Sequence, residues 1–125
     1  MADGCTTTKK DFEAFKKEAN AWIKKFGLLD WKVEYEHNDE NDDSRAVCVT
    51  DVPSKLCVIT LTVTWDRKPS TLDIKEHAFH EVCELLLAQI RHVTVNRFDM
   101  TLDAVNASFH YVIMSLLNSV YKPLT

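Results

Sequence analysis

The sequence predicts an α+β domain made of an N-terminal helix, three strands, a central helix and a C-terminal helix. Apolar residues recur at helical spacing over residues 9–26, 71–91 and from residue 101 onward, whereas between residues 31 and 65 they alternate with polar ones. The short connections between strands predict a three-stranded antiparallel meander with the helices packed on it. The 125 residues suit one core, so residues 1–125 are expected to form a single domain that begins with a flexible lead, residues 1–8.

Composition and charge narrow the class of protein. The net charge of −4 disfavours direct binding to nucleic acid. The first ten residues contain no apolar run typical of a signal peptide, and no window of the chain is apolar over the length of a bilayer-spanning helix. We therefore expect a protein that does not enter a membrane. The four cysteines follow no regular spacing, so we also expect free thiols and a cytoplasmic location.

The first helix and the strands carry local signals at their ends. Thr8 and Asp11 are spaced as a capping box at the start of the helix, and Gly27 follows its last apolar residue. The three strands are expected at residues 31–36, 45–51 and 56–65. Residues 38–44, NDENDDS, are interpreted as a solvated hairpin loop, since such residues dominate turns. They lack the glycine and the distal glutamate of an EF-hand, so a calcium site is rejected.

Residues 71–91 are expected to form one long amphipathic helix, capped by Ser70 or Thr71. The residues expected to face the core are Ile74, Ala78, Val82, Leu85, Leu86 and Ile90.

The final helix is expected to begin at a Thr101 cap and to end at Pro123, after a linker over residues 92–100 in which a short strand is an alternative. Its expected buried stripe consists of Leu102, Val105, Phe109, Val112, Ile113, Leu116 and Val120.

The polar face of the central helix carries the residues with the clearest chemistry. His77, His80 and Glu84 fall within about a sixth of the helix circumference, and Glu81 lies beside them. His80 to Glu84 reads HExxE, which differs from the zinc-binding HExxH motif in its last position. A carboxylate is a legitimate zinc ligand, and it shifts the preference toward manganese or iron. The alternative is a solvated helix face with no metal.

The segment A-F-H-E-x-x-x-L-L-L-A, which follows a strand ending in Trp65, resembles part of the minimal zincin-like metallopeptidases encoded by bacteriophages, relatives of SprT-like domains. The resemblance covers about residues 10–122 and rests on the order of elements and this one motif. It implies that His80 and Glu84 are metal ligands and that Glu81 is the general base.

The third ligand of such a site is open. The resemblance places it on the C-terminal helix, which has no glutamate, so Asp103, Asn106 or His110 would have to supply it, and we favour His110. His77, one turn before His80, is the other candidate.

Two functions from different classes follow. One is a metal-dependent peptidase, with zinc, manganese or iron lowering the pKa of a bound water and Glu81 accepting its proton. The other is a catalytically inactive zincin-like phage protein that binds a protein partner. In either case the protein is expected to act in the cytoplasm, that of the host if a phage encodes it. The oligomeric state is left open.

Overall fold

The computed structural model describes residues 5–40, 44–96 and 101–121, and the statements below concern these residues. The elements in chain order are α1 (Lys9–Lys25), β1 (Lys32–Asn38), β2 (Ala46–Asp51), β3 (Leu56–Thr62), α2 (Thr71–Leu86), α3 (Ala88–Val95), α4 (Leu102–Leu116) and the short π-helix η1 (Leu117–Tyr121). The predicted α+β class is confirmed. None of the described helices is both long and apolar enough to cross a membrane.

The helix starts follow the capping signals of the sequence. Thr8 and Asp11 form a complete capping box at the start of α1, and Ser70 forms another with Asp73 at the start of α2. Of the two caps considered for α2, Ser70 is therefore correct. Gly27, directly after the C-cap of α1, has φ +70°, a backbone conformation that glycine adopts without strain.

The sheet has the order β1-β3-β2, so the expected meander is wrong. β2 pairs with β3 antiparallel, but β1 pairs with β3 parallel, with Tyr35 opposite Ile59. The alternation of residues predicts which face of a strand is buried and does not specify its neighbour. The most apolar strand, β3, takes the central position, where both of its edges are paired.

The acidic segment after β1 is therefore not a hairpin loop, because β1 and β2 are not neighbours. Its first part is tied to the end of β3. The carboxylate of Asp39 accepts hydrogen bonds from the backbone N–H of Thr64 at 2.7 Å and from its hydroxyl at 2.9 Å. These bonds lower the pKa of Asp39. The remaining part, residues 41–43, lies outside the described residues.

The lead before α1 is also more ordered than expected over residues 5–8. Thr6 forms a bridge with Thr64, and the backbone N–H of Thr7 donates to the carbonyl of Val63 at 2.7 Å. The Thr7 hydroxyl lies 2.7 Å from Nε2 of His37, whose ring stacks on Phe12. The lead is thus held by backbone pairing beyond the end of β3, which the polar composition of residues 5–8 does not reveal.

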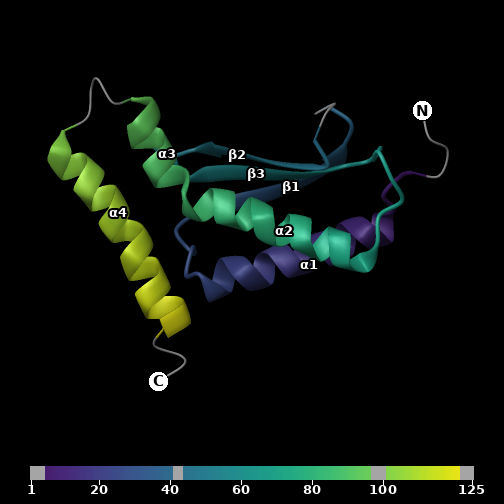
Figure 1. Cartoon of the computed structure of the whole chain (residues 1–125), viewed down its shortest axis with the longest axis horizontal. Coiled ribbons are helices and arrows are strands. Elements are labelled where there is room, and N and C mark those ends of the chain that lie inside the picture. Colours follow the sequence, from purple (N-terminus) through teal and green to yellow (C-terminus); the bar gives the residue numbers. More distant parts are fainter. Residues whose placement is uncertain (1–4, 41–43, 97–100, 122–125) are drawn as a thin grey trace.

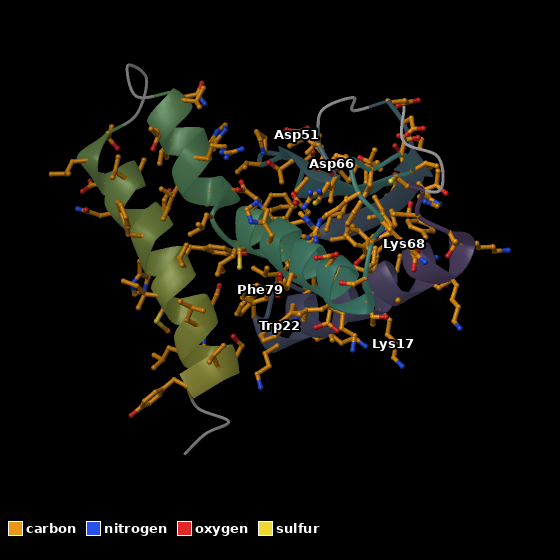
Figure 2. The ribbon with its side chains drawn as sticks, turned by 45° about the vertical axis from the view of Figure 1, so that its right-hand side comes forward. Lys17, Trp22, Asp51, Asp66, Lys68 and Phe79 are labelled. Atoms are coloured by element: carbon orange, nitrogen blue, oxygen red, sulfur yellow. The ribbon has the colours of Figure 1, made fainter. Side chains whose placement is uncertain are left out.

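The core lies between the sheet and the pair α1 and α2, which run side by side over one face (Figure 1). The fully buried residues there include Phe15 of α1, Ile59 and Leu61 of β3, and Val82 of α2. At the outer side of the helix pair, Trp22 meets Phe79 edge to face, with ring centroids 4.7 Å apart (Figure 2).

The long helix expected over residues 71–91 is interrupted. α2 ends at Leu86, Leu87 has φ −93° and ψ 1°, and α3 continues to Val95, so residues 92–95 are helical rather than linker or strand. No glycine or proline marks this break. Residues 97–100 of the expected linker lie outside the described residues.

The final helix begins at the expected Thr101 cap, but only part of its expected stripe is buried, chiefly Val112. Leu102 is 74% exposed, Phe109 50% and Ile113 59%, while Ser108 and Val112 are the buried residues of α4. α4 packs chiefly on α3 and lies off the end of the sheet rather than on it (Figure 1). The stripe thus marks an apolar face of the helix that the rest of the described chain does not cover. Pro123, expected to end the helix, lies outside the described residues.

Candidate functional site

A groove of about 710 Å³ lies between α2 and the start of β2, and it contains most of the residues singled out in the sequence. Its walls come from three elements that are far apart in sequence: the start of β2, the segment after β3, and the polar side of α2. The lining residues include Arg45, Trp65, Asp66, His77, His80 and Glu81.

One side of the groove is an edge strand, because β2 ends the sheet of the described chain. The N–H of Thr62 donates to the carbonyl of Arg45 at 3.0 Å, so Arg45 and every second residue after it direct their backbone groups toward β3. In this register Ala46, Cys48 and Thr50 direct their backbone N–H and C=O groups away from β3. These outward groups are the ones that an additional strand would pair with.

Arg45 lines the groove and contacts two other residues of its lining. Its guanidinium makes two parallel hydrogen bonds with the Asp66 carboxylate, at 2.7 and 2.8 Å, and lies over the ring of Trp65 at 5.4 Å. The pairing lowers the pKa of Asp66 to about 2 and keeps it ionised. Arg45 and Asp66 were not expected to line a site, because both lie beside strand ends, where no sequence motif marks them.

The two histidines of α2 occupy different surroundings. His77 packs edge to face against the buried ring of Trp65, 5.2 Å between centroids, and its burial is the main reason that its pKa is lowered. His80 has 65% of its side chain exposed, and its Nε2 lies 3.7 Å from the Glu84 carboxylate. His77 is therefore held in the wall of the groove as a neutral ring, whereas His80 lies open to solvent.

Glu81 is the unusual group of the site. It is only 5% exposed, because it is seven residues after Ile74 and four before Leu85 and so lies at the edge of the buried side of α2. Burial raises its pKa to about 7, with His80 acting in the opposite direction and Glu84 in the same one. A carboxyl group with such a pKa can take up and release a proton near neutral pH.

Glu84 is engaged by a basic partner. Nη2 of Arg91, on α3, lies 2.9 Å from its carboxylate. The break at Leu87 redirects the chain between these two residues, and both side chains are partly exposed. Glu84 is thus shared between Arg91 and His80 rather than turned into the groove.

The residues considered for a third ligand lie elsewhere. His110 lines a separate hollow with Lys24, Tyr111 and Ser119, between α4 and the end of α1. Asp103 and Asn106 belong to the same helix, which packs on α3. The structure brings His77, His80 and Glu81 together at the groove and does not bring His110 to them.

The donor set does not fit a metal ion held by three protein ligands. Over residues 5–40, 44–96 and 101–121, no three side chains of His, Cys, Asp or Glu converge in a way that could hold one. His80 and Glu84 approach each other, but Glu84 is paired with Arg91, and His77 is packed on Trp65.

The chain was compared with models of protein families, with curated proteins and with solved structures, and none of the three comparisons found a match.

Proposed function

We propose that this protein binds an extended segment of a protein partner. The segment adds as a strand to the free edge of β2 and lies along the groove between α2 and the start of β2. The outward N–H and C=O groups of Ala46, Cys48 and Thr50 support this proposal most directly. Addition of a strand supplies main-chain hydrogen bonds for affinity, and adjacent pockets select side chains.

The groove next to this edge fits the side chains of such a segment. The half-buried ring of His77, which packs on the buried Trp65, offers apolar surface, while Asp66 and Arg45 supply ionised groups. Glu81 and the exposed His80 add groups that can accept or donate hydrogen bonds on the floor of the groove. A mixed lining of this kind is typical of sites that fix orientation as well as affinity.

The test begins with a displayed library of linear peptides, followed by calorimetric titration of the synthetic peptides that are selected. Ala46→Pro removes an outward N–H without removing a bond to β3, so it is expected to weaken binding at least tenfold, about 1.4 kcal/mol. Ala46→Ser keeps the N–H and is the matched control. Failure of the library to yield any binder, or equal binding by the proline and serine variants, contradicts the proposal.

A second function, metal-dependent hydrolysis of a peptide bond, is supported by one observation, the buried Glu81 beside His80. The described residues offer no third ligand, so the metal would be held by His80 and Glu84, and Glu81 would accept the proton of a water. Zinc, manganese or iron should then be present near one equivalent in protein purified without chelators, and should be lost in His80→Ala. Glu81→Gln should keep the metal and lose peptidase activity. Protein without metal, and without a rise in Tm on addition of zinc, contradicts it.

A further inference from the structure

A row of exposed apolar side chains runs the length of α4 and is separate from the groove. Leu102, Phe109, Ile113 and Leu116 are between 36% and 74% exposed, and the half-buried Val105 completes the row. All five lie on one face of the helix, because they are three or four residues apart. We call these five residues the α4 stripe. Soluble monomers rarely leave so continuous an apolar row in water.

The face of α4 next to the stripe already serves the fold. Val112 and Ser108 are buried, and the hydroxyl of Tyr111 lies 3.2 Å from the Asp30 carboxylate. These contacts set the orientation of α4, and the α4 stripe lies beside this inner face, since Val112 is seven residues after Val105. The helix contains a single carboxylate, Asp103, and no lysine or arginine. A partner recognised by charge has little to bind here.

We propose that the α4 stripe is the interface of a homodimer in which two copies of α4 pack antiparallel across a two-fold axis. The spacing of the stripe is the reason for choosing a second copy of this chain. Its successive intervals are three, four, four and three residues, the same in both directions. An antiparallel pair centred on Phe109 therefore places Leu102 opposite Leu116 and Val105 opposite Ile113.

The area of the stripe is enough for such a dimer. Its five side chains, each presenting on the order of 100 Å², would remove on the order of 1,000 Å² from water in a pair of copies, which reaches the lower limit for a specific interface. The helix is roughly 22 Å long at 1.5 Å per residue, so two copies can align over the whole stripe. The absence of basic residues and the single carboxylate on α4 keep repulsion between two acidic chains small at the contact.

The first test is the molar mass of the full chain, measured by light scattering after size exclusion over a range of concentrations. The expected mass is twice the 14.4 kDa of one chain, and a single-chain mass up to millimolar concentration overturns the proposal. Phe109→Glu and Ile113→Glu are each expected to halve the mass, because both positions are at least half exposed in one copy and tolerate charge there. Leu72→Glu, at a helical position on α2 that is 65% exposed, is the matched control and should remain dimeric.

The orientation of the two helices has a test of its own. An equimolar mixture of Leu102→Cys and Leu116→Cys is expected to form a disulfide between the two introduced thiols under mild oxidation, with peptide mass spectrometry to identify the linked residues. Linkage of Leu102→Cys to itself in place of the mixed product would indicate a parallel pair and overturn the antiparallel arrangement. A dimer that persists in both glutamate variants would show that another surface holds the two copies.

Discussion

Arg91 of α3 lies 2.9 Å from the carboxylate of Glu84 of α2, across the break at Leu87. The pair joins two helices that the sequence presents as one, and it occupies a carboxylate that the HExxE motif would otherwise offer to a metal. Both side chains are partly exposed, so solvent screens the attraction between them.

The first prediction concerns this pair. Arg91→Gln is expected to change the free energy of unfolding by less than about 1 kcal/mol, because exposed ion pairs contribute little to stability. It should also strengthen any binding of zinc, since Glu84 becomes free to act as a ligand with His80. Urea unfolding gives the first quantity and calorimetric titration with zinc the second. A loss of stability well beyond this figure would indicate that the pair holds α3 in place.

The capping box of α2 gives a second prediction. The Ser70 hydroxyl accepts a hydrogen bond from the N–H of Asp73 at 3.1 Å, and the Asp73 carboxylate accepts one from the N–H of Ser70 at 3.0 Å. Ser70→Ala should lower the free energy of unfolding by about 1 kcal/mol, as measured in urea. Thr71→Ala, one residue further on, lacks this role and should be close to neutral. Equal losses in the two variants would show that the cap is not formed.

Glu81 gives a prediction about pH. Burial raises its pKa to about 7 in the folded chain, well above the value of an exposed glutamate, so the folded state binds the proton more tightly than the unfolded state. The contribution of this group to stability is therefore largest in acid and is lost as the pH rises from about 4.5 through about 7. Glu81→Gln removes this dependence.

The measurement is the Tm of both proteins between about pH 5 and about pH 8. The Tm of Glu81→Gln relative to the parent is expected to increase with pH across this window. The comparison with the variant cancels the other titrating groups, among them His37 and His77, whose lowered pKa values act in the opposite sense. A constant difference in Tm would mean that Glu81 ionises normally in the folded chain.

The thiols of Cys48 and Cys57 give a fourth prediction. Their sulfurs lie 3.4 Å apart between β2 and β3, and Cys57 is 1% exposed. The contact with Cys57, together with burial, raises the pKa of Cys48, which keeps its thiol protonated and weakly nucleophilic. Iodoacetamide should therefore leave both residues unmodified in the folded protein and label them after unfolding, as read by peptide mass spectrometry. Labelling of Cys48 at the rate of a free thiol in native buffer would contradict this packing.

Much of the fold could be read from the sequence because it depends on local signals. The capping residues Thr8 and Ser70 mark the starts of α1 and α2, and the alternation around Tyr35 and Ile59 marks strands. The pairing of β1 with β3 could not be read in this way, because periodicity assigns a face to a residue and not a neighbour to a strand.

The site was predicted only in part for a related reason. His77, His80 and Glu84 were singled out because they share one face of one helix, and Glu81 because of the HExxE motif; of these four, Glu84 does not line the groove. The position of His110 depends on how α4 packs beyond the break at Leu87, and the apolar spacing through Leu86 and Ile90 continues across that break without a glycine or proline. The same limit explains the α4 stripe, since spacing identifies an apolar face but not what covers it.

The central place of β3 also has a consequence for the order in which the chain folds. β2 and β3 are joined by the four residues 52–55, so their hairpin closes a short loop. β1 pairs with the other edge of β3, and all of β2 lies between these two strands in the sequence, so their pairing closes a longer loop. We therefore expect the hairpin of β2 and β3 to form first and β1 to be added to it in a slower step, although β1 comes first in the chain.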